Sequence, residues 1–341
     1  MKEIIISADQ SSQRFDKYLK RVITGESSGF IYKMLRKKNI TLNGKKADGT
    51  EILSVGDSVK FFFSDDTFEK VTEGKLRTTV GAADGVSAPN GKSEGMPIKG
   101  KSVLKNLVAG VSSDINVVSE DDDILIINKP IGVLSQKATG GDISINEMAL
   151  SYLYEKNAVT EESYMMFHPS VVNRIDRNTS GLILFGKTLK GSQYLSKLLS
   201  DRDILKLYRC VVKGRVDKET VLKGYLKKDE ATNRVVIKDN PFEDAKYIET
   251  GLKPVAYSKD GLLTLCEVHL ITGKSHQIRA HLAHIGHPLV GDYKYGDKAF
   301  NDGYKAKYKI MSQLLHSYRI VIDENNDLVA PMPKIYDRLM Q

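Results

Sequence analysis

Residues Asn173–Thr188 read NRIDRNTSGLILFGKT, a charged turn followed by an apolar run. Asp176 stands between Arg174 and Arg177, and residues 182–185 are all apolar, which is typical of a buried strand. A carboxylate fixed directly before such a strand can act as a nucleophile, a general base or a metal ligand. The structural alternative is a salt-bridged turn aspartate, because Arg–Asp pairs are common at protein surfaces.

Further β-like runs surround this stretch from about residue 115 onward, namely INVV, ILIIN, LYRCVV, NRVVI, LTLCEVHLI and SYRIVI. Helices are predicted at SINEMALSYLYEK and KGSQYLSKLLSDR, and they do not alternate regularly with the strands. This order predicts an α+β domain built on a mixed, largely antiparallel sheet. Cys210 and Cys266 lie in such runs without CxxC spacing, so we expect small core residues and neither a disulfide nor a zinc site.

Three segments are predicted along the chain. Residues 1–64 form a small α/β domain, with an amphipathic helix at QRFDKYLKRVI, a basic helix at GFIYKMLRKKN and strand-like runs around Asn43-Gly44 and Gly56-Asp57. Residues 65–114 are rich in Gly, Ser, Ala and Lys and lack apolar periodicity over most of their length, which predicts a flexible linker or insertion. Residues 115–341 form the larger domain.

Composition limits the partners and the location. The chain has 341 residues and a formal net charge of +8, which favours a polyanionic partner, although ordinary solubility explains so modest an excess equally well. No run has the length of a membrane span, and the first residues lack the apolar segment of a signal peptide. We therefore expect a cytoplasmic protein.

The stretch from His269 to Gly296 holds five of the seven histidines. A metal site is one interpretation, but no HExxH pattern is present and carboxylates nearby are few. Alternatively His276, Gln277, Arg279 and His281 form a cluster of donors to phosphate and sugar oxygens. Tyr208 opens another strand beside basic residues, and it is either a packed sheet tyrosine or a stacking platform for a base.

Together these motifs resemble the RluA-type family of pseudouridine synthases. The family's motifs appear in order as IINKPIGV, as Asn173 to Leu182, as Lys206-Leu207-Tyr208, as TGKSHQIRAH from Thr272, as the Gly-His-Pro-x-x-Gly-Asp block ending at Asp292, and as Leu315-His316-Ser317. Asn173 and Lys274 replace a His and an Arg that are usual in the family, and Val133 to Gln136 lack its usual His. Residues 1–64 resemble the S-four-type RNA-binding domain often joined to these enzymes.

The resemblance implies that uridine is isomerised by detaching uracil, rotating it and rejoining it through carbon, with no redox change, no cofactor and no metal. Asp176 would be the nucleophile, Arg279 its ion-pair partner, and Tyr208 a base-stacking residue and proton acceptor. Arg174 would fill the space left by the flipped base or bind phosphate. The residues expected to bind RNA are Arg174, Lys129, Lys206, Lys274, His276 and Gln277, and in the N-terminal domain Lys33, Arg36, Lys37, Lys38 and Lys45.

The resemblance also indicates a substrate. NKPIGV and GDYKYGDKAFN look most like the RluC-like subgroup, which implies 23S ribosomal RNA; an RluD-like or a transfer-RNA-specific synthase is the alternative. A non-catalytic RNA-binding protein and a metal hydrolase inhibited by chelators are the rival functions. We expect a monomer, because the partner is a large RNA.

Overall fold

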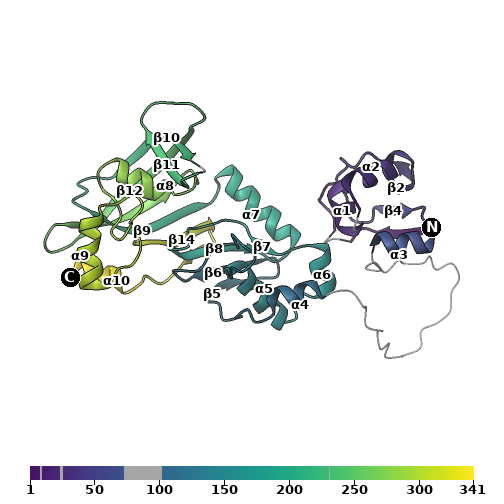
Figure 1. Cartoon of the computed structure of the whole chain (residues 1–341), viewed down its shortest axis with the longest axis horizontal. Helices are drawn as coiled ribbons and strands as arrows, with labels where there is room; N and C mark the ends of the chain where they lie inside the picture. Colours follow the sequence, from purple (N-terminus) through teal and green to yellow (C-terminus); the bar gives the residue numbers. More distant parts are fainter. Residues whose placement is uncertain (8–9, 24–25, 73–101, 230) are drawn as a thin grey trace. The chain divides into compact units, whose positions relative to one another are not determined.

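The computed structural model describes residues 1–7, 10–23, 26–72, 102–229 and 231–341, and the chain forms two compact units (Figure 1). The first unit comprises Met1–Ala109, Lys156–Pro169 and Thr188–Lys190, and the second comprises Gly110–Glu155, Ser170–Lys187 and Gly191–Gln341. Both units therefore contain segments that are distant in sequence. The contiguous domain boundaries expected from the sequence remain a proposal.

The first unit contains a four-stranded antiparallel sheet in the order β1-β4-β2-β3. Its strands are β1 (Lys2–Ile5), β2 (Ile40–Leu42), β3 (Lys45–Lys46) and β4 (Ser58–Phe61). The predicted amphipathic helix is confirmed as α1 (Phe15–Val22), which buries Phe15, Tyr18, Leu19 and Val22 at spacings of three and four. The basic helix is α2 (Ser28–Arg36), whose cap Ser27 accepts a hydrogen bond from the Phe30 amide at 3.3 Å.

Most of the predicted linker lies outside the described residues. Its two ends are helices, α3 (Asp65–Thr72) and α4 (Val103–Val108). Phe68 of α3 packs edge-on against Phe61, with ring centroids 5.3 Å apart, so α3 adds to the core of the first unit. The start of α4 is capped by Glu161 of α6 (Glu161–Met166), which accepts hydrogen bonds from the Leu104 and Lys105 amides.

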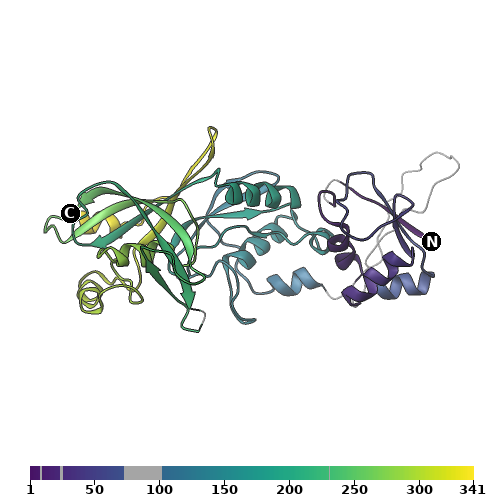
Figure 2. The same ribbon diagram turned by 90° about the horizontal axis from the view of Figure 1, so that it is seen from above.

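The second unit is built on one large sheet (Figure 2). Its described strands run in the order β11-β10-β12-β13-β9-β14-β8-β6-β5, with β15 beside β14 and β7 beside β8. Among the described strands only β14 and β8 pair in parallel, so the α+β prediction with a largely antiparallel sheet is confirmed. The strands are β5 (Val117–Glu120), β6 (Ile124–Lys129), β7 (Ser170–Val171), β8 (Ser180–Gly186), β9 (Leu205–Lys213), β10 (Thr220–Asp229), β11 (Arg234–Lys238), β12 (Lys246–Tyr257), β13 (Leu263–Leu270), β14 (Leu315–Asp323) and β15 (Asn326–Val329).

Helices pack on this sheet and connect its strands. They are α5 (Ile145–Glu155), α7 (Leu189–Asp201), α8 (Gln277–His284), α9 (Lys298–Tyr308) and α10 (Ile335–Met340). Residues 182–185 of β8 have no exposed surface. Leu182 and Leu184 pack with Leu195 of α7, and the strand pleat turns the two residues between and after them to the other face. The run that follows Asp176 is therefore a central strand covered on both faces.

Cys210 and Cys266 are unbonded, fully buried neighbours across β9 and β13, which confirms them as core residues. Burial, together with the adjacent Cys266, raises the pKa of the Cys210 thiol, so this thiol stays protonated. None of the helices in the described parts of the chain combines the length and apolar character needed to span a bilayer.

Candidate active site

Asp176 lies in the turn that enters the central strand β8. The turn is closed by a hydrogen bond from the Thr179 amide to the Asp176 carbonyl at 3.0 Å. Next comes Gly181, with φ of +104°. A Cβ at this glycine would lie 2.1 Å from the Ser317 carbonyl oxygen, so only glycine lets β8 run beside β14 here. Close packing directly behind the acid thus requires the glycine that ends the small polar turn.

Two side chains hold the backbone on either side of Asp176. The Ser135 hydroxyl donates to the Ile175 carbonyl at 2.7 Å and accepts from the Ile175 amide at 3.1 Å. On the other side the Lys129 ammonium donates to the carbonyls of Arg177, Val133 and Pro130 at 2.7 to 3.1 Å. Burial lowers the pKa of Lys129 to about 8. These contacts fix the loop without touching the carboxylate, which remains available.

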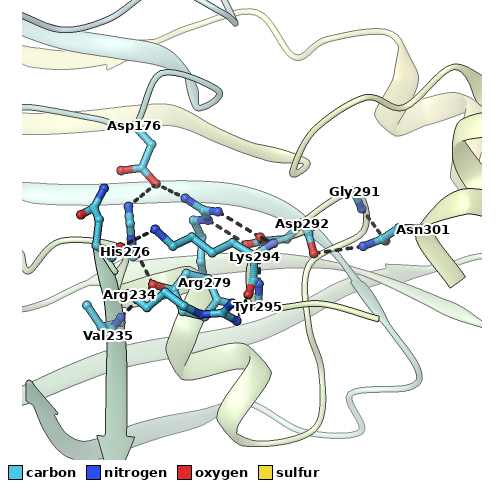
Figure 3. Close-up of polar contacts among 11 residues, drawn as sticks. Asp176, Arg234, Val235, His276, Arg279, Gly291, Asp292, Lys294, Tyr295 and Asn301 are labelled. Atoms are coloured by element: carbon cyan, nitrogen blue, oxygen red, sulfur yellow. Dashed lines mark hydrogen bonds and ion pairs between the residues drawn. The ribbon is translucent and has the colours of Figure 1, made fainter. Parts of the chain in front are cut away.

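Arg279 of α8 joins Asp176 to a second acid, Asp292 (Figure 3). Its Nη1 donates to Asp176 Oδ2 at 2.7 Å, while Nε and Nη2 bind the two Asp292 oxygens at 2.7 and 2.9 Å. Burial would raise the pKa of Asp292, but hydrogen bonds and charge from Arg279 outweigh burial and hold the pKa below its usual value. Burial likewise opposes the charge on Arg279, and the two carboxylates nevertheless raise its pKa. The guanidinium is a permanent cation at this site.

Tyr208 of β9 lies in the wall beside the acid and is only 5% exposed. Burial raises the pKa of Tyr208 to about 12, so the phenol is protonated at neutral pH. A protonated phenol is a poor proton acceptor. The geometry therefore supports the predicted stacking role of Tyr208 better than the predicted role as a base.

Asp176 and Tyr208 line a small cavity of about 60 Å³, together with Thr179, His276 and Arg279. The Thr179 hydroxyl is buried here and has no hydrogen-bond partner among the described residues, so a bound molecule can supply one. A cleft of about 810 Å³ opens from the same residues. Among the described residues that line it, Asp176 is the only acid and seven are basic: Lys137, Arg174, Arg177, Arg202, Lys206, Lys228 and Lys274. Such a cleft suits a polyanion.

The structure brings some of the predicted RNA-binding residues to this cleft. Arg174 and Lys274 are exposed in its wall, and Lys206 and His276 line it with less exposed surface. Two others have internal partners. The Lys129 ammonium is used within the protein, and Gln277 is 2% exposed and bonded to Thr272, Thr250 and backbone groups. A direct contact with RNA is not available to Lys129 here, and its position supports an anchoring role instead.

The basic residues predicted in the N-terminal segment are exposed on the first unit. Lys33 and Arg36 lie on α2, and Lys37, Lys38 and Lys45 follow on the turn and on β3. The histidines of the 269–296 stretch do not converge, and no group of three His, Cys, Asp or Glu side chains in the described parts of the chain is placed to hold a metal ion. His281, for example, is buried and bonded to Thr250 at 3.0 Å.

Comparison with known proteins identifies the family. A sequence profile described as RNA pseudouridylate synthase matches residues 123–284. The ribosomal large subunit pseudouridine synthase C of Rickettsia conorii is 30% identical over 96% of this chain and 96% of its own length. The chain belongs to the RNA pseudouridylate synthase family. It is therefore an isomerase that converts uridine to pseudouridine.

Other relatives agree with this result. The Vibrio cholerae protein of the same name is 29% identical over 93% of this chain and 87% of its own length. An RNA pseudouridine synthase of Mycoplasma genitalium is 26% identical over 99% of this chain and 94% of its own length. The solved structure of human RNA pseudouridylate synthase domain containing 1 covers 65% of this chain and 84% of its own, with a TM-score of 0.51 and 18% identity. That structure supports the fold.

Several residues that complete the site of this synthase were not singled out from its sequence. Asp292 closes the Gly-His-Pro-x-x-Gly-Asp block, but its bidentate contact with Arg279 depends on a loop 13 residues away. Ser135 appeared only as part of a departure from the family pattern, and its contact with Ile175 spans 40 residues. Tyr295, in the GDYKYGDK stretch, bonds His276 at 2.8 Å. Tyrosines are frequent in that stretch, and only the tertiary structure shows which one reaches the site.

Proposed function

We propose that this synthase modifies ribosomal RNA of the large subunit, with Asp176 as the nucleophile. The observation that carries the assignment of the acid is the 2.7 Å contact between Asp176 Oδ2 and Arg279 Nη1 at the base of the basic cleft. The ribosomal substrate is supported by the names of the relatives from Rickettsia and Vibrio, which this chain matches over most of their length. The particular uridines depend on the RNA.

The residues around Asp176 fit the isomerisation. Asp176 attacks either the sugar or the uracil ring, and the glycosidic bond to nitrogen is broken. The uracil turns, its carbon bonds the sugar, and the bond to Asp176 is released. That carbon loses its proton and the freed nitrogen gains one, so the atoms of the product equal those of uridine. Arg279 keeps a positive charge beside the carboxylate throughout, and Tyr208 offers a flat, protonated ring for the base. Arg174, exposed at the mouth of the cavity, can replace the flipped base in the RNA helix.

Pseudouridine mapping tests this function. The wild type, Asp176→Asn and the exposed control Asp114→Asn are each incubated with 23S RNA transcripts and, in parallel, with transfer RNA. We expect the wild type and the control to modify 23S RNA, and Asp176→Asn to lose activity by roughly a thousandfold or more while its RNA affinity is kept. Activity retained by Asp176→Asn would reject the assignment of Asp176 as the nucleophile. Modification of transfer RNA alone would reject the ribosomal substrate, and a loss of activity on chelation would point to a metal enzyme.

We also propose that the first unit is an S-four-type domain that binds RNA phosphates through α2 and β3. The exposed cations there support this proposal. A variant carrying Lys33→Gln, Arg36→Gln and Lys37→Gln is compared with one carrying Lys17→Gln, Lys70→Gln and Lys105→Gln, which removes three exposed charges elsewhere on the same unit. Each phosphate contact contributes about 0.7 to 0.9 to the slope of log K against log salt, so the first variant should lower the slope by up to roughly 2 to 3. Equal slopes for both variants would reject the proposal.

A further inference from the structure

His276 occupies a special position between α8 and the catalytic acid. It is the residue before α8 and adopts the left-handed conformation, with φ of 54°. This conformation turns the imidazole toward Asp176 and Tyr295 (Figure 3). The ring Nδ1 lies 2.8 Å from the Tyr295 hydroxyl, and Nε2 lies 4.0 Å from Asp176 Oδ2. One ring nitrogen is therefore hydrogen-bonded, and the other faces the carboxylate just beyond hydrogen-bond distance.

The hydrogen bonds of Tyr295 determine which nitrogen carries the proton. Its oxygen accepts a hydrogen bond from the Val235 amide at 3.0 Å. Among the described residues, the acceptor within reach of the Tyr295 proton is His276 Nδ1. A neutral imidazole has one protonated nitrogen, so Nδ1 as acceptor places the proton on Nε2. That N–H points to the catalytic acid.

The two oxygens of Asp176 then differ. Oδ2 accepts from Arg279 Nη1 at 2.7 Å and is the oxygen approached by His276 Nε2. Oδ1 accepts no hydrogen bond from any of the described residues. We propose that His276, with its tautomer set by Tyr295, is a positioning residue that directs its Nε2–H at Oδ2, the oxygen bound by Arg279, and leaves Oδ1 as the attacking oxygen. This proposal rests on Asp176 being the nucleophile.

The charges around the imidazole of His276 make its contacts with Tyr295 and Asp176 sensitive to pH. Burial lowers the pKa of His276; Asp176 and Asp292 oppose this change, while Arg279 and Lys294 add to it. The guanidinium of Arg234, over the Tyr295 ring at 5.6 Å, is another cation on this side. The imidazole is thus neutral at neutral pH. On acidification a proton enters at Nδ1, so the Tyr295 hydroxyl loses its acceptor and must turn its own hydrogen away from the ring. The rate of the chemical step should therefore fall on the acid side of the ordinary histidine pKa.

Three variants separate positioning from RNA contact. Tyr295→Phe keeps the ring but removes the donor to Nδ1, and Tyr293→Phe on the same loop is its matched control, because that exposed hydroxyl bonds only Asp302. His276→Gln can place an amide N–H near the Nε2 position, whereas His276→Asn can place one only near Nδ1. Asparagine suits the left-handed backbone better than glutamine. If His276→Gln is faster than His276→Asn, the difference therefore cannot arise from the preference of these residues for the left-handed backbone conformation.

The readouts are the single-turnover rate of pseudouridine formation from pH 5 to 9 and the dissociation constant for the same RNA. We expect Tyr295→Phe and His276→Asn to be slower by about 10- to 100-fold, with the dissociation constant within about twofold of the wild type. The fall of the rate at low pH should occur at a different pH in Tyr295→Phe and at the wild-type pH in Tyr293→Phe. His276→Gln should recover part of the rate. Weaker RNA binding at an unchanged rate, or identical behaviour of the two tyrosine variants, would overturn the proposal.

A second measurement does not depend on activity. Long-range proton–nitrogen NMR spectra of the full chain report which imidazole nitrogen of His276 is protonated. The wild type should show the Nε2–H tautomer at pH 8, and Tyr295→Phe should show a mixture. An Nδ1–H tautomer in the wild type would overturn the proposal whatever the activity. An inactive wild type with the Nε2–H tautomer would instead show that the proposed function had failed.

Discussion

Two loops each place an aspartate beside Arg279, and the two carboxylates differ in their exposure and in their hydrogen bonds. Asp292 is 1% exposed and accepts two hydrogen bonds from Arg279. It also accepts hydrogen bonds from the backbone amides of Lys294 and Tyr295, at 2.9 and 3.2 Å. The side chain of Asp176 is 28% exposed and accepts one hydrogen bond from the same guanidinium. Asn301 further braces the Asp292 loop through Gly291 and the Asp292 carbonyl (Figure 3).

The difference separates a structural acid from a reactive one. A buried carboxylate with every oxygen satisfied is held in place and is inert, because any movement leaves unpaired charge in a medium of low dielectric constant. A carboxylate with one free oxygen beside a cleft can meet a substrate. Asp292 thus fixes the cation, and the cation in turn fixes one oxygen of Asp176.

The largest effect expected from this comparison is on stability. Asp292→Asn keeps the shape of the side chain and removes its charge, so the buried Arg279 retains only the exposed Asp176 as an anionic partner. Breaking a buried ion pair from one side costs about 3–5 kcal/mol. Urea unfolding of the full chain should show a loss of this size for Asp292→Asn. The matched variant Asp176→Asn should change the free energy of unfolding by less than about 1 kcal/mol. Equal losses would remove the distinction between the two acids.

The sequence was sufficient for most strands and some helices of this fold. Residues 182–185 and the neighbouring apolar runs are strands because their side chains are buried in the sheet, and α1 was recognised from apolar spacings of three and four. Helix α8 was not recognised. Six consecutive residues from Gln277 to Leu282 are buried, so its sequence shows no contrast between an apolar and a polar face. Its histidines were interpreted as donors to ligands instead.

The site shows a similar limit. Asp176 and Arg279 are 103 residues apart, and their pairing came from the family resemblance. The RNA contact expected of Lys129 accompanied the family resemblance, and a lysine is usually exposed. The structure gives its ammonium three backbone carbonyls instead. The contacts of Lys129 and Asp292 are tertiary contacts, and no local pattern encodes them.

A smaller effect tests whether two buried neutral histidines near the Asp176–Arg279 ion pair contribute to stability. His281 follows Arg279 on α8 and bonds Thr250, and His316 of β14 bonds Ser180 at the end of the Asp176 turn, at 2.9 Å. Burial lowers the pKa of each of these histidines to about 4. The unfolded chain titrates near 6.5, so it binds more protons than the folded chain between these values. Stability should therefore be complete above pH 6.5 and fall as the pH drops toward 4.

The expected loss is about 2 kcal/mol for each of these histidines between pH 8 and pH 5. Urea unfolding at the two pH values measures it. His281→Asn and His316→Asn should each be less stable at pH 8 but lose less on acidification, because the titrating group is gone. If one of these variants kept the wild-type dependence of stability on pH, the histidine that it replaces would not be the group whose protonation destabilises the fold.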